Sequence, residues 1–198
     1  MLDLRFKGAR SYVHGTDMLN AAIRELTSGG APQPVEKLVF VINRMTARNL
    51  DLVVDEAQPP GLSPVASVRF ERAGARRHAI LVERPEPPRG RYAYDEDLLR
   101  ACCRVDLAGR AIVLEGESPF TPIETIVAMT KALHLALFPG TAGWLFSRLE
   151  APYWPPARFD VGVTVALAQS VGTRLTKSQV SLGRETLARV YFSLGEPA

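Results

Sequence analysis

The feature that most constrains this chain is an apolar helix predicted between Thr121 and Pro139. Thr121-Pro122-Ile123-Glu124 has the pattern of a capping box, with proline at the first helical position and a glutamate that can reach back to the cap. Apolar residues then cover most of the helix circumference until Pro139-Gly140 ends it. A helix that is apolar on nearly all sides must be surrounded by protein, so we expect it to be buried centrally.

Strand patterns accompany this helix on both sides in the sequence. Residues 159–167 alternate apolar and polar positions, which is typical of a half-buried strand. A turn at Gly183-Arg184 joins the last two strands. The elements predicted for this half are a helical turn at 95–101 and strands at 104–107, 111–115, 159–167, 173–182 and 186–194.

The first half of the chain shows the same order of elements. His14-Gly15-Thr16-Asp17 opens a helix that reaches about Thr27, and Gly29-Gly30 is expected to end it. Its apolar residues recur at helical spacing. The other elements predicted here are strands at 2–13, 36–44, 49–56, 65–71 and 77–83, with a loop at 58–61.

The two halves therefore look like a duplication. Each contains a long helix followed by strands that end in a hairpin, and the proline-rich segment 85–90 is the one credible linker between them. We expect one domain over 1–198, with repeats over 1–84 and 91–198, because neither half can bury its own helix alone. The alternative is an ordinary α+β domain whose halves are similar by coincidence.

Composition excludes several classes of protein. The chain has 198 residues, is 46% hydrophobic and 23% charged, and contains no apolar run of about 18 residues, so we expect a globular protein without a membrane span. The N-terminus lacks the apolar core of a signal peptide, which favours a cytoplasmic location. Net charge is +3, and no basic block or aromatic stripe suggests nucleic acid.

Metal and cofactor signals are also absent from the sequence. The three histidines are scattered, and the two cysteines, Cys102 and Cys103, are neighbours, so no ligand spacing and no structural disulfide is expected. No glycine-rich phosphate loop follows a strand. We therefore predict no metal and no cofactor.

The order of several short motifs resembles the hotdog family, in which an antiparallel sheet wraps a long helix. The resemblance is closest to the β-hydroxyacyl carrier-protein dehydratases. The residues that carry it are Val127-Ala128-Met129-Thr130-Lys131, Trp144-Leu145-Phe146, Arg158-Phe159 and the stretch from Thr173 to Phe192, with His14-Gly15 and Asn20-Ala21-Ala22-Ile23-Arg24 in the first half. This resemblance implies an α+β double hotdog with two long central helices, each wrapped by an antiparallel β-sheet.

The resemblance also implies a substrate class. Hotdog enzymes of this kind act on acyl thioesters of coenzyme A or acyl carrier protein, with a histidine near the helix and an acidic residue on it. Here the acidic position is Val127 in one half and Asn20 in the other. Because these residues differ, we expect at most one functional site, in the first half. Hotdog sheets commonly pair side by side, so the resemblance also implies assembly as a homodimer or a hetero-oligomer.

His14 and Asn20 are the predicted catalytic residues. His14 lies at the start of the first helix, where a neutral imidazole could act as a general base and the first helical amides could bind an oxyanion. A capping histidine is the alternative. Asn20 can hold a water or a thioester oxygen but cannot transfer a proton, which favours hydrolysis.

Four neighbouring residues are predicted to bind substrate. Gly15 allows close approach, Tyr12 could donate to an oxyanion, and Arg24, one turn after Asn20, could orient a phosphate or carboxylate. Asp17 is the fourth, and a favourable first-turn anion is its alternative role.

Three polar residues of the second helix are interpreted as structural or left open. Glu124 is explained by the capping box, and His134 by a place near the helix end. Lys131 must extend to solvent or find a partner.

Three functions remain open. A thioesterase is favoured, because hydrolysis needs a positioned water rather than an acid and a base. A dehydratase or isomerase of β-hydroxyacyl thioesters would need Asp17 or Glu124 to replace the missing helix carboxylate. A non-catalytic acyl-binding or assembly subunit is the third.

Overall fold

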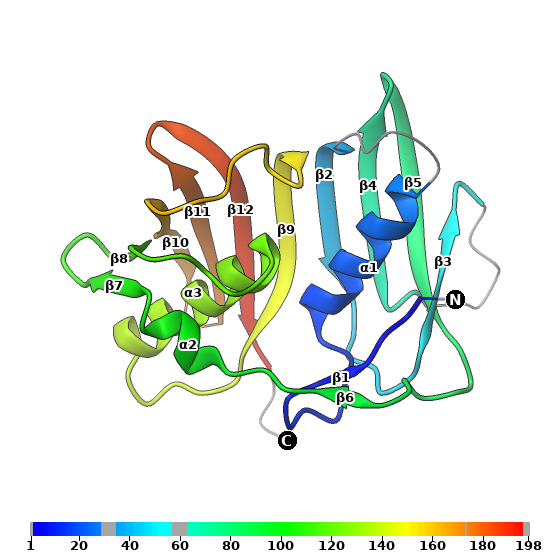
Figure 1. Ribbon diagram of the computed structural model, residues 1–198, viewed down its shortest axis with the longest axis horizontal. Coiled ribbons are helices and arrows are strands. Elements are labelled where there is room, and N and C mark those ends of the chain that lie inside the picture. Colours follow the sequence, from blue (N-terminus) through cyan, green and yellow to red (C-terminus); the bar gives the residue numbers. More distant parts are fainter. Residues whose placement is uncertain (1, 29–34, 57–62, 173, 196–198) are drawn as a thin grey trace. The chain divides into compact units, whose positions relative to one another are not determined.

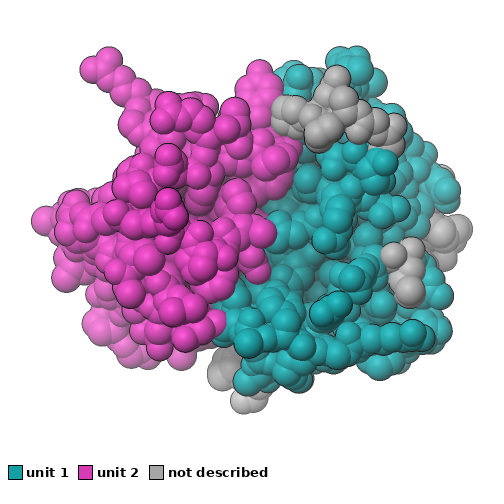
Figure 2. Space-filling view, viewed as in Figure 1, with its two compact units in different colours: residues 1–94 teal, residues 95–198 magenta. Residues whose placement is uncertain are grey.

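The computed structural model describes residues 2–28, 35–56, 63–172 and 174–195. The chain divides into two compact units, Met1–Tyr94 and Asp95–Ala198 (Figure 2). The predicted helix stop at Gly29-Gly30, the loop at 58–61 and the first residue of the strand predicted from Thr173 lie outside the described residues.

In the first unit, helix α1 lies across one face of a four-stranded antiparallel sheet (Figure 1). The strand order is β3-β5-β4-β2. The elements are α1 (Gly15–Thr27), β2 (Val35–Ile42), β3 (Leu50–Val54), β4 (Ala66–Arg72) and β5 (Ala75–Glu83). These bounds confirm the predicted helix and four of the predicted strands.

The apolar side of α1 packs into the interior of this unit. Leu19 and Ala22 are fully buried, and Met18 nearly so, whereas Arg24 and Glu25 are exposed. The sheet contributes Phe40 and other fully buried apolar side chains. The helical spacing of apolar residues in the sequence thus produced the one-sided burial expected of it.

The strand predicted over 2–13 is wrong in extent. Only β1 (Phe6–Lys7) forms, and it pairs in parallel with β6 (Arg91–Tyr92). Gly8 adopts a φ of 56°, and the Arg10 N–H donates to the Lys7 carbonyl at 3.2 Å, so the chain turns immediately after β1. A left-handed residue and a tight turn cannot continue a strand.

The second unit contains a six-stranded antiparallel sheet and two helices. The strand order is β9-β12-β11-β10-β8-β7. The elements are α2 (Glu96–Arg100), β7 (Cys103–Asp106), β8 (Ala111–Leu114), α3 (Pro122–Leu137), β9 (Trp144–Trp154), β10 (Val163–Val171), β11 (Leu175–Leu182) and β12 (Glu185–Leu194).

Helix α3 confirms the capping box and most of the expected burial. The Thr121 N–H donates to the Glu124 carboxylate at 3.1 Å, and every residue from Ile123 to Thr130 is buried. The last turn differs, because Leu135 is 45% exposed and Ala136 is exposed as well. The prediction of burial on nearly all sides therefore holds for the first half of the helix and fails at its end.

Two strands of this unit depart from the sequence prediction. β9, with 11 residues, was not predicted as a strand. β10 begins at Val163 rather than residue 159, because the Val161 N–H donates to the Asp160 side chain and Gly162 has a φ of 93°. The alternation seen in the sequence thus begins in a turn.

No described helix combines the length and the apolar character needed to cross a membrane.

Candidate functional site

A pair of two-residue strands brings distant side chains to the start of α1. β1 and β6 are paired so that Lys7 lies opposite Tyr92. The Phe6 N–H donates to the Gly90 carbonyl at 3.1 Å, and the Gly8 N–H donates to the Tyr92 carbonyl at 2.9 Å. This short ladder places a lysine and a tyrosine beside the first turn of the helix.

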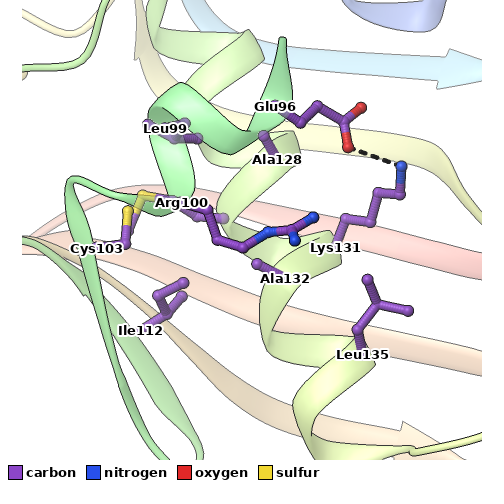
Figure 3. A pocket seen from close by; sticks show the side chains of 10 residues that line it. Glu96, Leu99, Arg100, Cys103, Ile112, Ala128, Lys131, Ala132 and Leu135 are labelled. Carbon is purple, nitrogen blue, oxygen red and sulfur yellow. Dashed lines mark hydrogen bonds and ion pairs between the residues drawn. The ribbon is translucent and has the colours of Figure 1, made fainter.

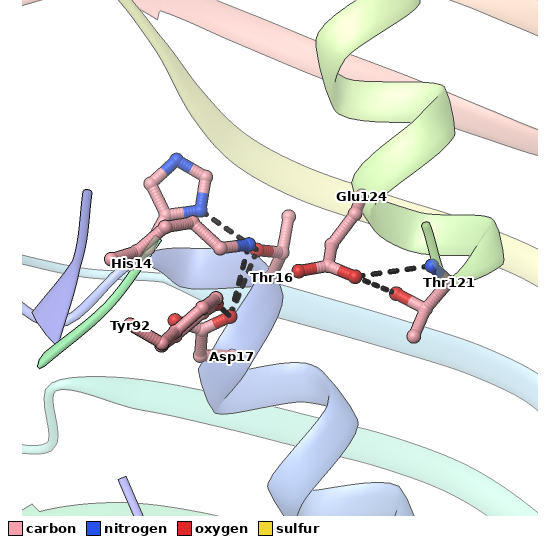
Figure 4. Close-up of polar contacts among 7 residues, drawn as sticks. His14, Thr16, Asp17, Tyr92, Thr121 and Glu124 are labelled. Carbon is pink, nitrogen blue, oxygen red and sulfur yellow. Dashed lines mark hydrogen bonds and ion pairs between the residues drawn. The ribbon is translucent and has the colours of Figure 1, made fainter. Parts of the chain in front are cut away.

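These side chains form a polar network around Thr16 and Asp17 (Figure 4). Lys7, which is fully buried, donates through Nζ to Thr16 Oγ1 at 2.8 Å and forms an ion pair with Asp17 Oδ1 at 3.1 Å. The Tyr92 hydroxyl donates to the same Asp17 oxygen at 2.8 Å. His14 joins through Nδ1, which lies 2.8 Å from Thr16 Oγ1.

His14 occupies the N-cap position of α1, yet its ring makes no capping hydrogen bond. The imidazole is half-buried, and the ring of Tyr12 stacks on it with centroids 6.3 Å apart. The first amides of a helix, here those of Gly15 and Thr16, have no acceptor within the helix and carry partial positive charge. A basic nitrogen and oxyanion-type donors therefore occur at one point of the chain.

The structure brings some of the predicted site residues together and separates others. Tyr12, His14, Gly15 and Asp17 all lie at the start of α1. Asn20 is half-buried further along the helix, and the helical rise per residue puts it about 9 Å along the axis from His14. Arg24 is exposed in the last turn, about 15 Å along the axis from His14.

In the second unit, the polar residues of α3 have structural partners. Glu124 accepts from both the N–H and the hydroxyl of Thr121. Lys131, predicted to extend to solvent or find a partner, is 37% exposed and forms an ion pair with Glu96 of α2 at 2.8 Å (Figure 3). The cavity beneath this pair, between α2, α3 and β8, measures about 10 Å³, room for about one water molecule. It is too small for an acyl substrate.

His134 is fully buried among aromatic rings. The rings of Trp144 and Phe192 lie 4.6 and 5.1 Å from its own, and its Nε2 lies 3.1 Å from the Thr176 hydroxyl. Burial lowers the pKa of His134 from 6.5 to about 4 because the protonated form is poorly solvated there. A neutral, enclosed histidine of this kind is part of the core.

A hollow of about 690 Å³ lies on the first unit over the charged ends of β4 and β5. Its lining mixes both signs of charge, and several of these charges are paired with one another. Lys37 pairs with Glu71 at 2.7 Å, and Arg77 pairs with Asp55. The hollow includes none of the predicted site residues.

Comparison with known proteins identifies the fold. No protein-family model and no curated protein sequence matches the chain. The solved structure of the tesB protein of Mycobacterium avium subspecies paratuberculosis is similar to it, with a TM-score of 0.50 and 13% identity over 98% of this chain and 91% of that one. The chain has an α+β hotdog fold.

Two further solved structures resemble this hotdog chain. A putative thioesterase from Novosphingobium aromaticivorans has a TM-score of 0.45 and 13% identity, and the match covers 98% of this chain and 92% of that one. The dehydratase domain of PpsC from Mycobacterium tuberculosis, solved with C12:1-CoA, has a TM-score of 0.43 and 16% identity, with 93% and 85% covered.

The cysteines and potential metal ligands add no second site. Cys102 and Cys103 are both free thiols, and burial raises the pKa of Cys103 to about 11, so little thiolate forms near neutral pH. Across the described residues, no group of three or more histidine, cysteine or acidic side chains could hold a metal ion.

Sequence reasoning missed three members of the network around His14. The sequence marks Thr16 only as part of the helix start, and Lys7 lies in a segment predicted to be a plain strand. Tyr92 is 75 residues from its partner Asp17. A lysine among Leu2, Leu4 and Phe6 carried the only local signal, because its burial requires a counter-ion.

Proposed function

We propose that this chain processes acyl thioesters of coenzyme A or acyl carrier protein, and that the reaction is hydrolysis. The observation that carries the proposal is the state of His14. It stands at the N-cap of a helix without capping it, and its Nδ1 is instead held by Thr16. A ring held through one nitrogen presents the other in a defined direction, as a general base requires.

In the proposed reaction, His14 Nε2 takes a proton from water, and the water oxygen forms a bond to the thioester carbonyl carbon. The amides of Gly15 and Thr16 stabilise the negative oxygen that develops. Collapse of this intermediate breaks the carbon–sulfur bond, and His14 returns the proton to the leaving thiolate. Asn20 orients the water or the carbonyl group.

The contacts of the two candidate acids, Asp17 and Glu124, favour hydrolysis over dehydration. Dehydration requires an acid as well as a base. Asp17 Oδ1 forms an ion pair with Lys7 and accepts a hydrogen bond from Tyr92. Glu124 Oε2 accepts a hydrogen bond from Thr121, the N-cap residue of its own helix. Each carboxylate already accepts hydrogen bonds within its own unit, which disfavours its use as the additional proton donor that a dehydratase needs.

The proposal extends to the architecture and assembly. The helix and antiparallel sheet found in each unit support a double hotdog in which the repeats serve one protein and only the first carries chemistry. A cytoplasmic location and assembly as a homodimer or a hetero-oligomer belong to the same proposal.

The test is the hydrolysis of a panel of acyl-CoA and acyl-carrier-protein substrates. Hydrolysis is measured as the release of free thiol, after subtraction of a blank that accounts for the protein's own cysteines. We expect turnover that falls at least about a hundredfold in His14→Gln and in Asn20→Ala. His78→Gln, which changes an exposed histidine on β5, is the matched control and should retain activity.

Other outcomes distinguish the remaining functions. Loss of water from β-hydroxyacyl thioesters without thiol release would show a dehydratase. An absence of all turnover, together with a co-purified acyl ligand, would show a binding subunit. Hydrolysis that survives both site substitutions would contradict the proposed site.

A further inference from the structure

Lys7 is the most deeply buried charged side chain near His14. Its side chain is fully buried, whereas the side chain of Lys37 is 70% exposed and that of Lys131 is 37% exposed. Removing an ammonium group from water is costly unless it is paired and hydrogen-bonded. A lysine at such a place requires a specific set of partners.

The partners of Lys7 are a carboxylate, a hydroxyl and aromatic rings. Its Nζ lies 3.1 Å from Asp17 Oδ1, 2.8 Å from Thr16 Oγ1 and 4.2 Å from the centre of the Tyr94 ring. A cation over an aromatic face gains further stabilisation in a desolvated site. These contacts compensate the charge and tie it to the first turn of α1.

The hydrogen-bond capacity of Thr16 restricts how the network can be arranged. A hydroxyl has one proton to donate and can accept two hydrogen bonds, and a lysine ammonium only donates. Thr16 Oγ1 therefore accepts from Lys7. Its own proton can go to Asp17 Oδ1, 3.4 Å away, or to His14 Nδ1, 2.8 Å away.

With Asp17 ionised in its ion pair with Lys7, only one arrangement satisfies all three contacts of this hydroxyl at once. If Thr16 donates to Asp17, its second acceptor position receives an N–H from His14 Nδ1. The proton of the neutral imidazole is then on Nδ1, and Nε2 is the basic nitrogen. If Thr16 donates to His14 instead, its contact with Asp17 is lost and Nε2 carries the proton.

We infer that Lys7 is a positioning residue that keeps the basic nitrogen of His14 at Nε2. Its ammonium keeps Asp17 ionised and therefore an acceptor, Asp17 receives the Thr16 proton, and Thr16 receives Nδ1–H. Without Lys7, the Asp17 side chain, only 12% exposed, loses this counter-ion. Burial then favours the neutral acid, which donates to Thr16 and turns the hydroxyl proton towards Nδ1.

The use of Nε2 as the base in hydrolysis rests on the proposed function, but the inference about which nitrogen carries the proton does not. Nitrogen-15 chemical shifts of the imidazole, measured by long-range proton–nitrogen correlation on the neutral side chain, report which nitrogen carries the proton. His14→Gln, His78→Gln and His134→Gln assign the three signals. This readout needs no substrate and would not respond to a merely structural role of Lys7.

The experiment compares wild type, Lys7→Met and Lys37→Met. We expect His14 to carry its proton on Nδ1 in wild type and in Lys37→Met, and on Nε2 in Lys7→Met. With a substrate, Lys7→Met should lower kcat by about a hundredfold while KM changes little. Lys37, an exposed partner of Glu71, is the matched control.

Two results would overturn the inference. One is a wild-type His14 that carries its proton on Nε2, which needs no variant and therefore holds even if Lys7→Met does not fold. The other is a folded Lys7→Met protein with the wild-type tautomer. A wild-type Nδ1 proton without any thioester hydrolysis would instead refute the proposed function and leave the role of Lys7 intact.

Discussion

The buried histidine of α3 makes the stability of this protein depend on pH in a defined window. His134 is enclosed by aromatic rings and its pKa falls from 6.5 to about 4. Above both values it is neutral in the native and the unfolded state and contributes no pH dependence. Between them, only the unfolded chain takes up the proton, so stability falls as pH falls. Below about 4 the loss levels off.

The size of this effect follows from the difference between the two pKa values. A shift from 6.5 to about 4, at about 1.4 kcal/mol per unit, corresponds to roughly 3 kcal/mol over the whole window. Between about pH 7.5 and about pH 5, the loss amounts to about 2 kcal/mol. Carboxylates whose pKa is lowered by their partners, such as Glu83 beside Arg44 and Thr46, lose their contribution at lower pH. In the upper part of this pH window, the change in stability therefore reports the contribution of His134.

The assay is urea unfolding of wild type, His134→Gln and His78→Gln at several pH values in this range. Glutamine can still bond to the Thr176 hydroxyl but does not titrate. We expect the pH slope to disappear in His134→Gln and to persist in His78→Gln, the exposed control. An equal slope in wild type and His134→Gln, or no slope in wild type, would refute the reasoning.

Three further changes test the core, the cap and the thiols. Leu19→Ala, at a fully buried position in α1, should lower the free energy of unfolding by about 2–5 kcal/mol in urea unfolding. Its control, Leu135→Ala, changes a side chain that is 45% exposed and should lower this free energy by under about 1 kcal/mol. Glu124→Ala should cost about 0.5–2 kcal/mol by the same assay, because the Thr121 amide loses its acceptor; an unchanged midpoint would argue against the cap. In Cys102→Ser, alkylation of Cys103 should be slow at neutral pH and accelerate up to about pH 11, and a flat rate profile would contradict the burial of this thiol.

Much of the secondary structure could be predicted because its causes are local. The capping box of α3 lies within four consecutive residues, and the Glu124 contact forms as the pattern requires. The turns at Gly74 and Gly183 adopt the positive φ that glycine allows, and the hairpins β4–β5 and β11–β12 form around them. These elements depend on neighbours in the chain, so a pattern of a few residues is sufficient.

Strand limits were less predictable where side chains or turns intervene. β9 has no regular alternation and was missed, whereas the alternating stretch from residue 159 includes a turn at Asp160 and Gly162. A strand forms where a neighbouring strand offers backbone partners, and β12 supplies them to β9. The periodicity of side chains reports burial rather than pairing.

The two long helices with their apolar sides, most of the strands and the candidacy of His14 follow from the sequence alone, because each depends on residues a few positions apart. Only the tertiary structure decided what surrounds His14. Lys7 and Tyr92 reach Asp17 through a ladder of two short strands, and Tyr92 lies 75 residues away in the chain. A buried charge selects its partners by distance in space, and no spacing in the sequence encodes that distance.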